Sequence, residues 1–136
     1  MTMFGILPVA ASGADAMQTW IDTAAGNIAN MDDAVPATQP AYAEQTPVLA
    51  PAGNLAPGTP ADGVAVTSIQ LGDTTGDISY DPGNPLANAQ GEVKLPDVSM
   101  SDQLTGMIEA QESYQADTVV MQRAQTAYAA GLAIGS

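Results

Sequence analysis

The chain has no cysteine, no histidine and only two basic residues, Lys94 and Arg123, among its 136 residues. Without cysteine it forms no disulfide and no thiolate metal site, and without histidine it lacks the commonest general base. Two cations cannot neutralise the phosphates of a nucleic acid or of an anionic membrane surface. The sequence therefore excludes binding to nucleic acids and anionic membranes, and it excludes most nucleophilic and metal-dependent mechanisms of catalysis.

Large aromatic side chains are also scarce, because the sequence has one Trp, one Phe and four Tyr beside 13 Gly and 10 Pro. A core built from this set is expected to be thin. The net charge is −13, and nine of the 15 acidic residues lie between residues 32 and 97. The two ends of the chain are thus weakly charged, a pattern that favours ends that bury themselves against partners.

No run of about 20 apolar residues is present, so we expect no membrane-spanning helix. The segment Phe4–Ala16 has an apolar run and small residues, but no basic residue precedes it and Pro8 interrupts it. A signal peptide normally has a basic first part and an uninterrupted apolar run. We therefore expect no cleaved signal peptide.

Carboxylates are the one abundant reactive group, and pairs of them can serve a hydrolase or bind calcium. Asp73–Asp77 reads DTTGD, which differs from the Asp-Thr-Gly loop of aspartic proteases by an extra threonine. The surrounding acids lack the spacing, the central glycine and the closing glutamate of an EF-hand. We therefore interpret this segment as a turn at the end of a strand, and expect no enzyme activity, no bound metal and no cofactor.

Apolar residues recur at helical spacing near the N-terminus, which predicts a helix within residues 1–31. Pro8 is tolerated best in a first turn, so we expect the helix to begin near Leu7. Asn27 and Asn30 are expected near its end, where a proline-rich stretch follows. The residues expected on its apolar face are Ile6, Ala10, Gly13, Met17, Trp20, Ala24 and Ile28.

Residues 32–97 are rich in proline and glycine and predict loop or extended chain. Within them, Val64–Leu71 is the clearest strand candidate. Tyr42–Ala50 is an edge-strand candidate, because Pro47 bars a central position in a sheet. Two further short candidates are Asp77–Tyr80 and Gly91–Leu95.

A second helix is predicted within residues 98–136, opened by a capping box of Ser99 and Asp102. Two rows of residues then recur every seven positions, as in a coiled coil. The first row is Met100, Met107, Tyr114, Met121 and Tyr128. The second, more polar row is Leu104, Gln111, Thr118, Gln125 and Leu132.

These elements predict a mainly α fold. Long amphipathic helices at the two ends are expected to pair as an antiparallel coiled-coil-like hairpin, with a small irregular β element in the middle. A simple intramolecular core of the two helices is the alternative interpretation. The half-polar rows and small residues favour a hairpin that packs against helices of other chains.

Three stretches of the chain share their pattern with one known family. Residues 80–100 read YDPGNPLANAQGEVKLPDVSM, a Tyr-x-Pro-Gly-Asn-Pro-x-Ala loop followed by Gly-x-Val-x-x-Pro. Residues 112–117 read ESYQAD, which matches Ser-Tyr-Gln-Ala-Asn with Asp117 in place of the asparagine, and residues 10–32 contain Ala-Ser-Gly and Ala-x-Asn-x-Ala-Asn. In these stretches the chain resembles flagellar basal-body proximal rod proteins of the FlgC type, whereas residues 32–63 match little. The motif residues are Asn27, Asn30, Tyr80, Pro82, Gly83, Asn84, Pro85, Tyr114, Gln115 and Ala116.

The resemblance implies a structural subunit of the proximal rod, with the terminal helices paired in the inner wall of a helical tube. The implied partners are copies of the chain, other flagellar rod proteins and the flagellar type III export gate, through which the chain passes unfolded. The Pro-Gly loop is then expected to fix the angle at which the last helix leaves the β element. The residues expected at subunit interfaces are Ile6, Gly13, Met17, Trp20, Ile28, Met100, Leu104, Met107, Tyr114, Met121, Tyr128 and Leu132.

Two alternatives stay open on the sequence. One is another axial protein of the same export path, such as a different rod subunit. The other is a secreted two-helix binding module unrelated to flagella. The loop motif and the short middle favour the FlgC type, because distal rod and hook subunits carry larger insertions.

Overall fold

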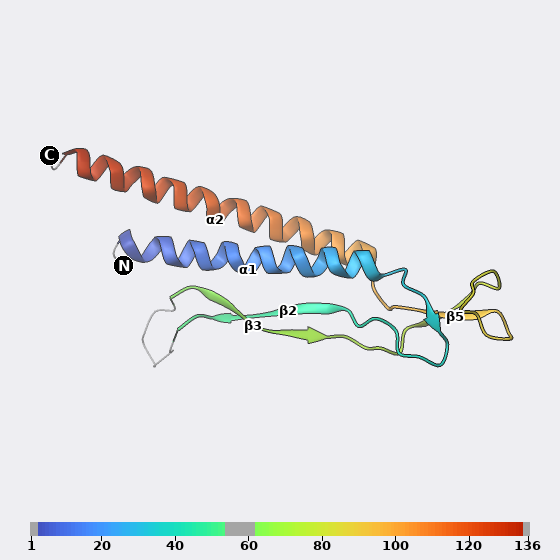
Figure 1. Ribbon diagram of the computed structural model, residues 1–136. Coiled ribbons are helices and arrows are strands. Elements are labelled where there is room, and N and C mark those ends of the chain that lie inside the picture. The colour runs from blue at the N-terminus through green and yellow to red at the C-terminus, as the bar shows by residue number, and fades with distance from the viewer. Residues whose placement is uncertain (1–2, 54–61, 135–136) are drawn as a thin grey trace.

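The computed structural model describes residues 3–53 and 62–134 and has two long helices at its ends (Figure 1). Helix α1 (Met3–Asn30) and helix α2 (Met100–Ile134) lie side by side and run in opposite directions. Five short strands fill the middle of the described chain: β1 (Val35–Pro36), β2 (Gln45–Pro51), β3 (Val64–Leu71), β4 (Asp77–Tyr80) and β5 (Glu92–Leu95). The predicted mainly α fold with a small β part is confirmed.

Helix α1 begins earlier than the sequence predicted. It starts at Met3 and carries Pro8 inside it, so the expected start near Leu7 is wrong. A proline removes one backbone donor from a helix, but the first four donors of any helix have no partner within it. Pro8 is the sixth residue of the helix, just beyond those positions, so including it costs one hydrogen bond close to the helix start. Its last residue is Asn30, where the sequence predicted the end.

Helix α2 begins at Met100, directly after the predicted cap. The backbone N–H of Asp102 donates to the Ser99 hydroxyl oxygen at 3.4 Å, which satisfies one of the unpaired donors of the first turn. The helix has 35 residues against 28 in α1. It extends beyond the described start of α1 (Figure 1).

Strands β2 and β3 form an antiparallel ribbon that lies along α1, on the side away from α2 (Figure 1). Pro47 pairs with Ile69 and is tolerated because both strands of a two-stranded sheet are edges. The bounds of β3 are those that the alternating pattern predicted. Helix α1 is therefore the central layer of the molecule, covered on one side by a helix and on the other by a ribbon.

A second sheet has the strand order β1-β5-β4 and lies beyond the C-terminal end of α1 (Figure 1). Val93 of β5 is its buried centre, with 2% of its surface exposed. Strand β1 was not predicted, because two residues carry no alternating pattern and pair only when β5 lies beside them.

The interior of the described chain consists mostly of alanine. Val93 and Pro96 are the only apolar side chains larger than alanine that are buried there. A buried methylene group stabilises the folded state by about 0.8 kcal/mol, so an alanine core contributes much less than a leucine core of equal count. The thin core that composition predicted is confirmed. The buried alanines are Ala10, Ala14, Ala16, Ala24, Ala41 and Ala110.

Candidate assembly surface

Asn27 joins three segments of the molecule through its side-chain amide. Its Nδ2 donates to the backbone oxygen of Gln45 at 2.8 Å and to Oε1 of Gln103 at 2.9 Å. Its Oδ1 accepts from the Tyr42 hydroxyl at 3.0 Å and from the Gln45 backbone N–H at 2.9 Å. All four hydrogen-bonding positions of the amide are thus used, and only 1% of the residue is exposed.

The network continues to Glu44, the residue directly before β2. Gln103, itself buried, donates from Nε2 to Oε1 of Glu44 at 2.7 Å. Helix α1, the start of β2 and the first turns of α2 are therefore held in one arrangement by buried polar groups. The sequence pattern placed Asn27 at the helix end, whereas it lies one turn inside. Asn30 is the terminal residue, and its Nδ2 donates to the Gly26 oxygen within the same helix at 2.7 Å.

The two helices approach closely because glycine stands at two contact points. The carboxylate of Asp117 occupies the space that a side chain at Gly13 would fill. Nε1 of Trp20 lies 3.3 Å from where a Cβ on Gly106 would be. With the Asn27–Gln103 bond, these contacts run in opposite order along the two helices, which fixes an antiparallel register.

The expected interface residues of α1 differ in their exposure to solvent. Ile6 is exposed, while Gly13, Met17, Trp20 and Ile28 are half-buried. The glycine and the tryptophan contact α2 directly. Some residues of this set therefore pack against α2, and others leave apolar surface exposed that a neighbouring subunit can cover.

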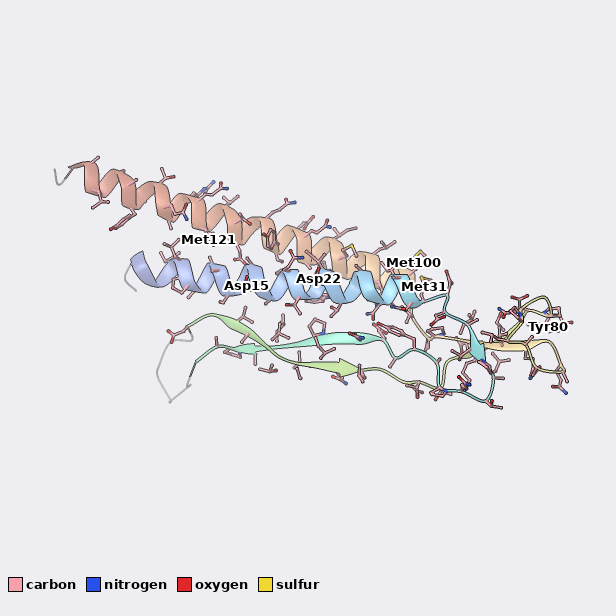
Figure 2. The ribbon with its side chains drawn as sticks, viewed as in Figure 1. Asp15, Asp22, Met31, Tyr80, Met100 and Met121 are labelled. Carbon is pink, nitrogen blue, oxygen red and sulfur yellow. The ribbon has the colours of Figure 1, made fainter. Side chains whose placement is uncertain are left out.

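The expected interface residues of α2 also differ in their exposure to solvent. Met107 and Met121 are half-buried, and Met121 lies on the side of α2 toward α1 (Figure 2). The others are partly exposed in the isolated chain: Met100, Leu104, Tyr114, Tyr128 and Leu132. Of the residues that resemble the family motif in this helix, Tyr114, Gln115 and Ala116 are all exposed.

Most of the second predicted row of α2 is exposed, including Leu104 and Leu132, and only Thr118 is half-buried. The neighbouring row of small and polar residues is turned inward. Hydrophobic pattern favoured the large side chains, but close helix packing selects small ones. The row that lies toward α1 is Gln103, Ala110, Asp117 and Ala124.

An apolar stripe runs along the outer side of α2, defined by Met100, Leu104, Ile108 and Val119. Their spacings of four, four and eleven residues place them on one helical face. Leu104 is 45% exposed and Ile108 57% exposed. This outer stripe has no covering element in the described chain, because the strands contact α1 and not α2.

The proline-glycine loop joins β4 to β5 at the far end of the molecule, where Tyr80 is 74% exposed (Figure 2). Its backbone is closed by hydrogen bonds from the Asp81 N–H to the Gly91 oxygen at 2.9 Å and from the Asn84 N–H to the Asp81 oxygen at 3.1 Å. Strand β5 separates this loop from α2. An effect of the loop on the exit angle of the last helix must therefore act through β5, and this role stays a prediction.

The glycine that this loop requires is also not the one the motif suggested. Gly83 has no positive φ, and a Cβ there would meet nothing closer than an Asp81 oxygen at 3.7 Å. Gly91 has a φ of 78°, and a Cβ there would lie 2.8 Å from the Tyr80 ring. Pro82 and Pro85 flank the turn that Asn84 closes, and the Asn84 side-chain oxygen accepts from the Leu86 N–H at 3.0 Å.

The acidic segment Asp73–Asp77 forms the turn before β4, as interpreted from the sequence. The hydroxyl and the backbone N–H of Thr75 donate to Asp73 at 2.7 and 2.9 Å and hold the pKa of its carboxyl below the ordinary value. In the described residues no three acidic side chains are grouped as metal ligands. Neither described helix has the length and apolar character needed to cross a membrane.

Comparison with known proteins gives relatives along the whole chain, although no protein-family model matches it. It is 33% identical over 136 residues to the flagellar basal-body rod protein FlgC of Salmonella typhimurium and 32% identical to that of Escherichia coli O6:H1, with 99% of each chain covered. The FlgC protein of Bacillus subtilis is 28% identical over 149 residues, again with 99% of each chain covered. The chain therefore belongs to the FlgC family of flagellar basal-body rod proteins, and it is a structural component of the basal body rather than an enzyme.

Proposed function

We propose that this chain is a subunit of the proximal rod that assembles with copies of itself and with other rod proteins into a helical tube. The outer stripe of α2 carries the proposal, because it exposes large apolar side chains on a molecule whose interior is nearly all alanine. Burying such side chains between subunits provides the main driving force for association. A repeated contact that does not close on itself yields a helical rod.

We assign the inner wall of the tube to residues 1–31 and 98–136 and the outward part to residues 32–97. The α1–α2 contact supports a coiled-coil-like pairing in this wall. Gln103, Ala110, Asp117 and Ala124 recur every seven residues on the side toward α1, with Met107 and Met121 between them. A seven-residue repeat of this kind keeps two helices in register over several turns.

The chain reaches the basal body, in this proposal, as an unfolded polypeptide that leaves through the flagellar type III export gate. The alanine core supports this route, since little burial opposes unfolding before export. The ordered state is then completed by neighbouring subunits. Assembly is therefore expected to add stability to a subunit that is only marginally stable alone.

The test places a charge on the outer stripe. Leu104→Asp in the host bacterium should lower the amount of subunit in purified basal bodies about tenfold or more, because burying leucine stabilises a contact by about 1.5–3 kcal/mol and a buried carboxylate would lack a cation. The amount of exported protein should not change, because an exported chain is unfolded.

Thr105→Asp is the matched control. It adds the same charge one residue along, about 100° around the helix, on the exposed face that also carries Glu109. Its incorporation should stay close to that of the wild type. Normal incorporation of Leu104→Asp would remove the outer stripe from the assembly surface, and absence of the wild-type chain from basal bodies would overturn the proposed function itself.

A further inference from the structure

A recess of about 400 Å³ opens where the first half of α1, the start of β3 and the middle of α2 meet. Its walls are mainly apolar, and its polar groups are the Asp117 carboxylate and the Ser113 hydroxyl. This volume corresponds to roughly a dozen waters at about 30 Å³ each, which is ample for one long side chain. The lining residues are Val9, Gly13, Met17, Gly63, Val64, Ser113 and Asp117.

The carboxylate at this recess is placed by the backbone of α1. Asp117 is half-buried, and it lies against Gly13 in space that any larger residue at that position would occupy. In residues 3–53 and 62–134 it forms no hydrogen bond or ion pair with another side chain or with the backbone. Asp117 also stands where the motif that the chain resembles has asparagine, so the negative charge is a feature of this sequence.

A partly desolvated carboxylate beside apolar walls matches one kind of side chain. Lysine and arginine carry an aliphatic stem that packs on apolar surface and a charged head that pairs with a carboxylate. The recess offers both partners, with Val9 and Met17 along the stem and Asp117 at the head. A neutral or acidic side chain would leave the carboxylate unpaired, at a cost in desolvation.

The chain cannot readily supply that cation itself. Nζ of Lys94 donates to the Gln39 oxygen at 2.9 Å in the far sheet. Arg123 follows Asp117 by six residues, which turns it about 240° around α2 and away from the recess. A second copy offers only the same two cations among 15 acidic residues, so a neighbour richer in lysine and arginine suits this carboxylate better.

We propose that the recess is a docking site for a lysine or arginine side chain of a different axial protein, which anchors this subunit to a basic neighbour in the rod. The inference rests on the proposed function. It adds to that function a specific contact, carried by charge, that is separate from the apolar outer stripe.

The experiment measures incorporation of variants into basal bodies in the host bacterium. Asp117→Asn keeps the shape of the side chain and restores the residue of the resembled motif, so it removes the charge with little effect on the fold. Its incorporation should fall at least threefold, and that of Asp117→Lys at least tenfold. Glu109→Gln and Glu109→Lys, on an exposed part of the same helix away from the outer stripe, should incorporate like the wild type.

The donor is identified by charge reversal. A lysine or arginine changed to glutamate in another axial protein should restore incorporation of Asp117→Lys. Restoration by Arg123→Glu in the same chain would assign the cation to a second copy and overturn the proposal, as would normal incorporation of Asp117→Asn. Circular dichroism of the exported chains should show equal helix content. Failure of the wild-type chain to enter basal bodies would instead count against the proposed function.

Discussion

At the scale of single residues, the most constrained position is a polar one. Asn27 is only 1% exposed, less than the leucines and methionines described beside it, and all its hydrogen-bonding positions are used. A molecule with an alanine core gains little shape specificity from apolar packing. The buried amide supplies that specificity, because only one arrangement of α1, β2 and α2 satisfies it.

Asn27→Ala should therefore lower the free energy of unfolding by about 2 kcal/mol or more, since it leaves the Tyr42 hydroxyl, the Gln45 backbone and Gln103 without their partner. Urea unfolding of the isolated chain, followed by circular dichroism, measures the change. Asn30→Ala is the control, because Asn30 bonds only within its own helix and is expected to contribute under about 1 kcal/mol. Equal effects of the two substitutions would refute the role assigned to Asn27.

At the scale of secondary-structure elements, the sequence predicted the helices and strands whose hydrophobic pattern repeats over many residues. Both helices and β3 were found because their periods run over many residues, although α1 starts earlier than predicted. The strand candidates around Pro47, at Asp77–Tyr80 and near Lys94 were also found, since prolines and glycines mark their limits. The two-residue strand β1 was missed, because its pairing depends wholly on β5.

The contacts between elements were harder to predict. The sequence predicted a coiled-coil seam of two rows, one beginning at Met100 and one at Leu104, whereas the structure turns the row containing Ala110 toward α1. A small residue contributes to helix packing by letting a side chain of the opposite helix approach closely. Which small residues do so depends on the opposite helix, and the sequence of one helix alone does not show it. Gly13 and Gly106 show the point, because each matters only for the side chain that lies over it.

A pair of glycine substitutions in α2 tests this packing. Gly106→Leu should destabilise the fold by about 1–3 kcal/mol, because its side chain must displace Trp20. Gly131→Leu meets no atom within 4 Å at its Cβ, and it should stabilise the helix slightly because leucine is a better helix former. Trp20 is the single tryptophan of the chain, so its fluorescence during urea unfolding reports the contact directly. Destabilisation of the same size by both substitutions would contradict the close approach of the helices.

At the scale of the whole molecule, the thin core and the excess negative charge both lower the stability of the isolated subunit. The described chain buries few large apolar groups, and its full sequence carries 15 acidic residues against two basic ones. Each feature lowers the stability of the isolated subunit, the first by reducing burial and the second by self-repulsion. Both are relieved when neighbours cover the apolar stripe and supply cations, so the rod is expected to hold the chain in a more stable state than solution does.

The stability of the isolated chain should therefore rise with ionic strength. Between about 0.01 M and about 1 M salt the Debye length falls from about 30 Å to about 3 Å, which screens repulsion among the acidic side chains. Two cations offer few attractive pairs that the same screening would weaken. The urea midpoint measured at several concentrations of sodium chloride should move upward by an amount equivalent to about 1 kcal/mol, whereas sucrose of equal osmolality should reproduce only part of that rise. A midpoint that falls with salt would mean that attraction outweighs repulsion in the folded chain, and that the excess negative charge is balanced within the subunit rather than by its neighbours.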